Sequence, residues 1–177
     1  MPDTAPWPTL QTPRLTLRAL RREDAPSLAR LVNDADIARM TTSIPYPFPN
    51  GAAEDFIDRM ANCDARREGV FAVEVRDQGF AGVLGFHPDS AGVSEIGYWL
   101  GRPYWSQGYM TEAVHAALTW AGHGWGKRYV LSGHFADNPA SGQVLIKTGF
   151  LYTGDVLRRY SMARGQDAAT RMMVWLA

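Results

Sequence analysis

Cysteine is nearly absent from this sequence, and long apolar runs are absent altogether. Cys63 is the single cysteine among 177 residues, which excludes an internal disulfide and any zinc site built from several cysteines. Its place in an apolar-periodic stretch near Met60 favours a buried structural thiol over a nucleophile. No run approaches the roughly 20 apolar residues of a membrane-spanning helix, and residues 1–10 lack the basic and hydrophobic regions of a signal peptide. We therefore expect a cytoplasmic protein without a membrane partner.

An excess of one charge is also lacking. Lysine and arginine total 18, aspartate and glutamate total 18, and the formal net charge is zero. This balance gives no support for a nucleic acid or a membrane surface as partner. Hydrophobic residues make up 46% and charged residues 20% of the chain, which is typical of globular proteins and too apolar for a disordered one. The length fits a single domain over residues 1–177, with residues 1–11 as an extended lead-in.

Strand-like and helix-like patterns of apolar residues follow one another along the chain. The predicted strands are residues 14–18, 70–76, 80–86, 94–100, 129–133, 151–160 and 168–175, and the predicted helices are residues 23–33, 52–67, 109–122 and 139–148. A further turn of helix is expected at 37–40, while the prolines between 44 and 51 exclude regular structure there. Antiparallel and βαβ pieces coexist in this order. They indicate an α/β protein with a mixed sheet and helices on both faces.

Residues 95–113 have a pattern that suits anion binding. A strand leads through a short loop into a helix, whose first turn leaves backbone N–H groups without helical partners. The helix dipole adds to their attraction for an anion, and Gly108 has no side chain to keep a phosphate away. Tyr109 stands where a nucleotide P-loop needs lysine, so an NTPase is disfavoured. The alternative is that Gly108 only eases a tight strand-to-helix loop.

The same segment resembles a family signature. Residues 97–100 read Gly-Tyr-Trp-Leu and residues 104–113 read Tyr-Trp-Ser-Gln-Gly-Tyr-Met-Thr-Glu-Ala. This is similar to the signature of GNAT-type N-acetyltransferases, most of all to the branch of the ribosomal-protein alanine N-acetyltransferases. Residues 12–18 and 138–150 resemble two further segments of that branch. The resemblance implies a GNAT-like fold, which is a mostly antiparallel twisted sheet with splayed central strands and helices on both faces.

The resemblance also implies acetyl-CoA as co-substrate, in a V-shaped gap between the strand ending at Leu100 and the strand at 129–134. No metal is expected, because no two histidines have metal-ligand spacing with a carboxylate. Trp105 and Met110 depart from the usual ends of the glycine-rich pattern, but the backbone N–H of Met110 stays available. The expected contacts to the pantetheine arm, thioester and diphosphate are Tyr98, Trp99, Leu100, Gln107, Gly108, Tyr109, Met110, Thr111, Asn138 and Ser141.

Two residues are the candidates for moving protons in a direct acetyl transfer to a primary amine. Glu95 shares a strand face with Trp99 beside the expected thioester and would accept the amine proton, directly or through a water. The alternative is a carboxylate paired with an arginine at the sheet end. Ser141 matches the family position for protonating the leaving sulfur, or else bonds only the helix backbone. His87 and His134 lie near strand ends and would shuttle protons, unless they are structural or solvent-exposed.

The acceptor side is less defined by the sequence. An aromatic loop between two helices is a natural rim for an acceptor site, although it would equally cover the core edge. The candidate substrate-binding residues are Tyr46, Phe48, Trp99 and Tyr104. The implied acceptor is a primary amine, either a protein N-terminus or a small molecule, and dimers in this branch make a homodimer one candidate assembly. The competing function is a non-catalytic module that senses acyl-CoA or scaffolds a partner.

Overall fold

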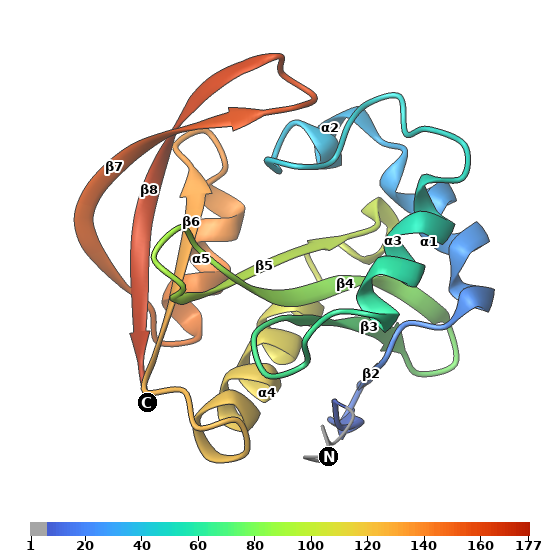
Figure 1. Ribbon diagram of the computed structural model, residues 1–177, viewed down its shortest axis with the longest axis horizontal. Coiled ribbons are helices and arrows are strands. Elements are labelled where there is room, and N and C mark those ends of the chain that lie inside the picture. The colour runs from blue at the N-terminus through green and yellow to red at the C-terminus, as the bar shows by residue number, and fades with distance from the viewer. Residues whose placement is uncertain (1–6) are drawn as a thin grey trace.

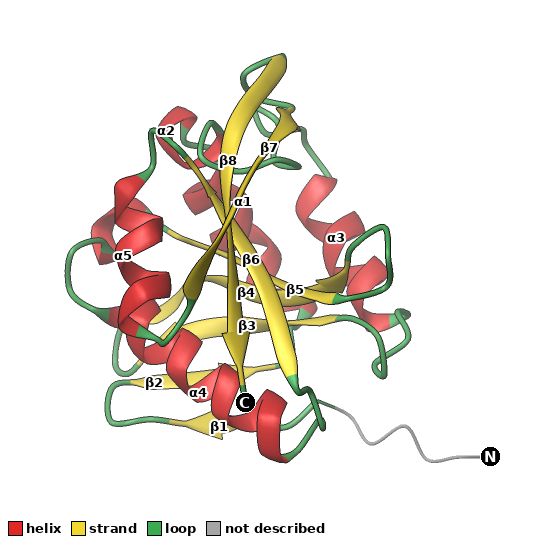
Figure 2. Cartoon of the chain, turned by 90° about the vertical axis from the view of Figure 1, so that its left-hand side faces the viewer, coloured by secondary structure: helices red, strands yellow, loops and turns green. Residues whose placement is uncertain are grey.

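Eight strands form one twisted sheet with helices on both faces (Figure 1, Figure 2). The computed structural model describes residues 7–177. The strands are β1 (Leu10–Gln11), β2 (Leu15–Arg18), β3 (Gly69–Val75), β4 (Gly79–Pro88), β5 (Ser94–Leu100), β6 (Tyr129–Phe135), β7 (Leu151–Ser161) and β8 (Gln166–Leu176). The helices are α1 (Ala25–Val32), α2 (Ala35–Ala38), α3 (Ala52–Ala61), α4 (Tyr109–His123) and α5 (Pro139–Lys147), with 3₁₀ turns at Arg22–Asp24 and Arg102–Tyr104.

The strands lie in the order β1-β2-β3-β4-β5-β6-β8-β7. Every neighbouring pair is antiparallel except β5 and β6, which are parallel. The predicted mixed and mostly antiparallel sheet is therefore confirmed. The parallel pair lies in the middle of the sheet, and α4 connects its two strands.

Predicted and observed elements differ most at the end of α3. The prediction of a helix over 52–67 is wrong, because α3 ends at Ala61. The side chain of Asn62 donates to a carbonyl of the last turn (2.7 Å), and the Asp64 carboxylate accepts from a backbone N–H two residues later (3.1 Å). Such local side-chain bonds compete with the helical backbone bonds. β1 was not predicted, and residues 1–6 of the expected lead-in lie outside the described residues.

Cys63 lies just after α3. Its thiol donates to the Met60 carbonyl (3.1 Å) and lies 3.4 Å from the Glu68 carbonyl oxygen. Burial, with a further contribution from the Glu68 carboxylate, raises the pKa of the thiol. Its side chain is only half-buried rather than buried as predicted.

Two hydrophobic cores lie on opposite faces of the sheet. The face under α4 packs Leu15, Phe71, Phe86, Ile96 and Val114, with an aromatic cluster that includes Trp7, Trp120 and Trp125. The other face packs Leu28, Leu31, Ile57, Ala72 and Val83 under α1 and α3. Because side chains alternate along a strand, successive residues of β5 pack into opposite cores, one under α4 and the other under α1 and α3.

A buried ion pair joins β2 to the turn that starts α1. Both guanidinium nitrogens of Arg18 bond the Asp24 carboxylate (2.8 and 2.9 Å), and each side chain is 8% exposed. Burial by itself raises the pKa of Asp24, but hydrogen bonds from Arg18 and from the Arg21 amide outweigh it and lower the pKa below its ordinary value. Arg18 also pairs with the Glu74 carboxylate (2.8 Å), so removing Arg18 would leave the buried Asp24 without its counter-charge, whereas removing Asp24 would leave Arg18 one carboxylate partner.

No helix within residues 7–177 combines the length and apolar character that crossing a membrane requires.

Candidate active site

The central feature is a gap between β5 and β6. In the described chain these parallel strands share one register pair, Glu95 with Leu131. Just beyond it the Ser132 hydroxyl donates to the Ile96 carbonyl (3.0 Å), and from there the strands diverge (Figure 1). Along a strand the backbone polar groups point alternately to the two edges, so Tyr98 directs its N–H and C=O to the same edge as Ile96. These groups face the gap.

The gap is flanked by α5, whose first turn carries two of the predicted contacts. The Asn138 side-chain oxygen accepts from the Ser141 N–H (3.3 Å) and caps the helix, and Pro139 occupies the first turn. The Tyr98 hydroxyl lies 3.0 Å from the Ser141 hydroxyl and 3.1 Å from the Ser141 carbonyl oxygen. Burial raises the pKa of Tyr98 well above its ordinary value. Ser141, Asn138 and Tyr98 therefore form one polar cluster beside the gap.

The turn before α4 presents backbone at its surface. Gly108 is the N-cap of α4 with φ +79°, a left-handed conformation that glycine adopts without steric cost. A Cβ atom there would stand 3.3 Å from Arg14 Nη2. Arg14 holds the turn in place, because its Nη1 donates to the Gln107 carbonyl (2.8 Å) and its Nε to Glu112 (2.7 Å). Met110 is buried in the core.

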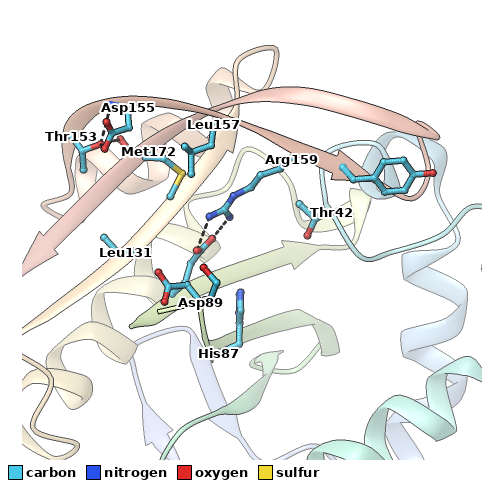
Figure 3. Close-up of a pocket in the computed structure, with 12 residues that line it drawn as sticks. Thr42, His87, Asp89, Leu131, Thr153, Asp155, Leu157, Arg159 and Met172 are labelled. Carbon is cyan, nitrogen blue, oxygen red and sulfur yellow. Dashed lines mark hydrogen bonds and ion pairs between the residues drawn. The ribbon is translucent and has the colours of Figure 1, made fainter. Parts of the chain in front are cut away.

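On the opposite face of β5 lies a cavity of about 510 Å³. Figure 3 shows Arg159 of β7 above it, with Thr42, Leu131 and His87 at its walls. Arg159 donates through both terminal nitrogens to the two carboxylate oxygens of Glu95, one bond being 2.9 Å. The hydrogen bond to Glu95 outweighs burial and raises the pKa of Arg159. The Glu95 side chain is only 7% exposed. Both of its oxygens accept hydrogen bonds from Arg159.

The β7–β8 hairpin reaches over this cavity and is fastened at its tip. The Ser161 hydroxyl donates to the Thr41 carbonyl (2.9 Å), and the Met162 N–H donates to the Thr42 carbonyl (3.0 Å). In Figure 1 the hairpin extends across to the loop after α2. The loop after α2, the β4–β5 region and the β7–β8 hairpin, which are distant in the sequence, therefore surround this cavity.

The predicted acceptor residues are spread over other places. Tyr46 is 50% exposed and lines a second pocket of about 390 Å³, beside α2 and the β7–β8 hairpin. Phe48, Trp99 and Tyr104 pack against the core under α1 and α3. Trp99 does share the face of Glu95, as the strand period predicts, but none of these four aromatic residues lines the cavity beside Glu95.

The two candidate histidines differ in their surroundings. His134 is buried on the α5 side, with Nδ1 2.9 Å from the Phe135 carbonyl and Nε2 2.9 Å from the Tyr152 hydroxyl. His87 is exposed and lines the cavity. Among residues 7–177 no group of three or more metal-ligating side chains is present.

Sequence reasoning missed Arg159 and the hydroxyl of Tyr98. Arg159 is 64 residues from Glu95, and Tyr98 is 43 residues from Ser141. A sequence pattern within one segment cannot predict a contact over either distance. The one signal available was the general alternative that Glu95 pairs with an arginine, and the structure has this arrangement.

Comparisons with known proteins agree with this architecture. Residues 14–151 match the family model of the acetyltransferase (GNAT) domain. An uncharacterized N-acetyltransferase of Bacillus subtilis (strain 168), YoaA, is 28% identical over 174 residues, with 94% of this chain and 95% of the relative covered. The uncharacterized N-acetyltransferase p20 of Bacillus licheniformis is 30% identical over 164 residues, with 89% and 90% covered.

Solved structures show the same fold. RimL, a ribosomal L7/L12 alpha-N-protein acetyltransferase in complex with coenzyme A, superposes with a TM-score of 0.82 at 21% identity, covering 96% of this chain and 98% of that one. The spermidine N-acetyltransferase from Vibrio cholerae, in complex with CoA and spermine, gives 0.77 at 18% identity, covering 93% and 96%. The GNAT fold expected from the resemblance is confirmed. The chain belongs to the GNAT family of acetyltransferases, and it is an acyltransferase.

Proposed function

We propose that this enzyme transfers the acetyl group of acetyl-CoA directly to a primary amine. The observation that carries the proposal is the gap between β5 and β6. It has the free backbone groups of Tyr98 along one side, the α4 turn near one end and the cavity beside Glu95 on the acceptor face. Together they offer sites for a phosphate group, an amide-bearing chain and an amine.

The α4 turn fits a diphosphate. The first helical N–H groups have no intrahelical partners, and Gln107 and Gly108 are exposed residues. Gly108 has no Cβ that would keep a phosphate from its backbone, and a Cβ built there has one neighbour within 4 Å, Arg14 Nη2. We therefore assign the diphosphate to the amides from Gln107 to Thr111, and the pantetheine chain to the backbone of Tyr98–Leu100, with Asn138 beside it.

Acetyl transfer at the gap has three requirements: a neutral amine, a donor for the carbonyl oxygen and a proton for the leaving sulfur. The amine must reach the thioester carbon as the neutral base, because an alkyl ammonium, with a pKa of about 10.4, has no free electron pair. A backbone N–H near Trp99–Leu100 would stabilise the negative charge on the carbonyl oxygen, and removing one such donor lowers rates roughly 10²–10³-fold. The leaving sulfur needs a proton, which we assign to the Ser141 hydroxyl, hydrogen-bonded to Tyr98.

The acceptor cavity favours a cationic molecule. Asp89, Glu95 and Asp155 line it, against the single guanidinium of Arg159. Carboxylates in excess attract an ammonium group. Both kinds of acceptor named for the structural neighbours, a ribosomal protein α-amine and spermidine, carry such a group, and both stay open for this enzyme.

The test combines binding and turnover. Acetyl-CoA binding is measured by calorimetry, and free-thiol release is followed with a panel of amines that includes an N-terminal alanine peptide, spermidine and lysine. Binding with amine-dependent thiol release is expected. Binding of acetyl-CoA without release for any amine would contradict the proposal and favour a sensor.

A further inference from the structure

His87 lies on the acceptor face of the sheet, next to the first residues of β5. It is opposite Glu95 in the β4–β5 register, and it lines the cavity that also holds Arg159 (Figure 3). A Cβ built on Gly97 would stand 3.9 Å from His87 Cε1. The ring therefore lies at van der Waals distance over Gly97, one residue before Tyr98, whose backbone faces the gap.

The neighbouring carboxylate is already engaged. Both oxygens of Glu95 accept from Arg159, and the Glu95 side chain is nearly buried. Protonating Glu95 would leave the guanidinium of Arg159 without its counter-charge in a partly buried place, which is unfavourable. Glu95 is therefore suited to holding Arg159 and the β7 strand over the cavity, and poorly suited to accepting a proton in each turnover.

The other histidines of the chain are excluded by position. Both ring nitrogens of His134 have partners, on the side of the sheet away from the cavity. His115 and His123 are exposed on α4. His87 is the one histidine that lines the cavity, and no hydrogen bond from residues 7–177 occupies its ring nitrogens in the structure.

We propose that His87 is the general base of the reaction and that Glu95 is a positioning residue acting through Arg159. The inference rests on the proposed function. The amine nitrogen bonds the acetyl carbon while a ring nitrogen of His87 accepts the amine proton. The carbon–sulfur bond breaks with its electron pair on sulfur, which takes a proton from the Ser141 hydroxyl. His87 then releases its proton to solvent and Ser141 regains one, so the sum is amide and free thiol.

The charges around His87 suit this role. The cavity around it is lined by three carboxylates and one guanidinium, so a cationic amine is attracted to the place where the ring nitrogens lie. The titratable and charged groups that face His87 across the cavity are Glu95 on β5, Asp89 in the β4–β5 turn, and Asp155, Arg159 and Tyr160 on β7. Asp89 is fixed there, because its Oδ1 accepts from the backbone N–H groups of Ala91 and Val93 (2.8 Å each).

The experiment compares His87→Gln, Glu95→Gln and the matched control His115→Gln, with acetyl-CoA and the faster of two probes, an N-terminal alanine peptide or spermidine. Turnover is measured across about pH 5–9, which brackets the titration of imidazole. We expect His87→Gln to lower kcat by roughly 10²–10⁴-fold, leave acetyl-CoA affinity unchanged and remove the acidic limb of the pH profile. Added imidazole should restore part of the activity of His87→Ala, which loss of a merely structural contact would not allow.

Glu95→Gln should keep the acidic limb, lower the melting temperature and raise KM for the amine more than it lowers kcat. His115→Gln should match the wild type. The inference is overturned if His87→Gln keeps both its rate and its acidic limb, or if Glu95→Gln is the variant that loses the limb. A wild type that binds acetyl-CoA and transfers to neither probe nor any panel amine overturns the proposed function itself, and this inference with it.

Discussion

The assignment of the α4 turn to a diphosphate is tested by comparing two glycines that share a conformation. Gly108 caps α4 at φ +79° and ψ 4°, and Gly51 caps α3 at φ +82° and ψ −12°. An L-residue in this left-handed region costs about 1–2 kcal/mol. Gly108→Ala and Gly51→Ala should therefore lose similar free energies of unfolding, measured by urea denaturation.

Their surroundings differ. A Cβ at Gly51 meets nothing within 4 Å, whereas one at Gly108 stands 3.3 Å from Arg14 Nη2, at the exposed turn that leads into α4. If the backbone of this turn binds the diphosphate, the methyl group keeps the phosphate at a distance. One hydrogen bond to a charged group contributes about 1.5–3 kcal/mol, so Gly108→Ala should weaken acetyl-CoA binding roughly 10- to 150-fold.

Calorimetry with two ligands makes the comparison specific. Acetyl-CoA carries the diphosphate, and S-acetyl-pantetheine lacks it. Gly108→Ala should lose affinity for acetyl-CoA and keep its affinity for S-acetyl-pantetheine, while Gly51→Ala should bind both as the wild type does. Unchanged acetyl-CoA affinity in a folded Gly108→Ala protein, or an equal loss in Gly51→Ala, would refute the assignment.

Other consequences of the structure are measurable in the same protein. Asp24→Asn removes the buried one of the two carboxylates that pair with Arg18 and leaves it only the part-exposed Glu74, so it should cost up to about 3–5 kcal/mol of unfolding free energy. Because the folded pKa of Asp24 is lowered, its contribution should be complete at neutral pH and be lost as the pH falls below about 4, through that lowered pKa, in acid unfolding curves. Ser141→Ala should lower kcat with acetyl-CoA affinity held, in steady-state kinetics and calorimetry, and a change in affinity alone would make it a binding residue. Asn138→Ala removes the α5 cap and should cost about 0.5–2 kcal/mol in thermal unfolding. Cys63 should react more slowly with a disulfide reagent at neutral pH than a free thiol does, because burial raises its pKa, and an equal rate would contradict the burial.

Much of the fold is readable from local pattern. The strand predicted at 94–100 has the bounds observed for β5, and the helix predicted at 109–122 differs from α4 by one residue at its end. The pattern succeeds there because side-chain periodicity and turn residues act within a few positions of the chain. It fails after Ala61, where the side chains of Asn62 and Asp64 compete with helical bonds. The motif around Gly108 also belongs to this local class, since strand, turn and helix N-terminus are contiguous.

The sequence by itself determined the order of elements, the family and the turn that presents backbone N–H groups. Only the tertiary structure decided the partners of the candidate catalytic groups: Arg159 on Glu95, the Tyr98 hydroxyl on Ser141, and His87 free in the cavity. The physical reason is that these contacts join strands and helices far apart in the chain. The side chains that meet beside the gap are set by the point where β5 and β6 diverge and by the path of β7 over the sheet. A periodic pattern within one segment contains no information about either.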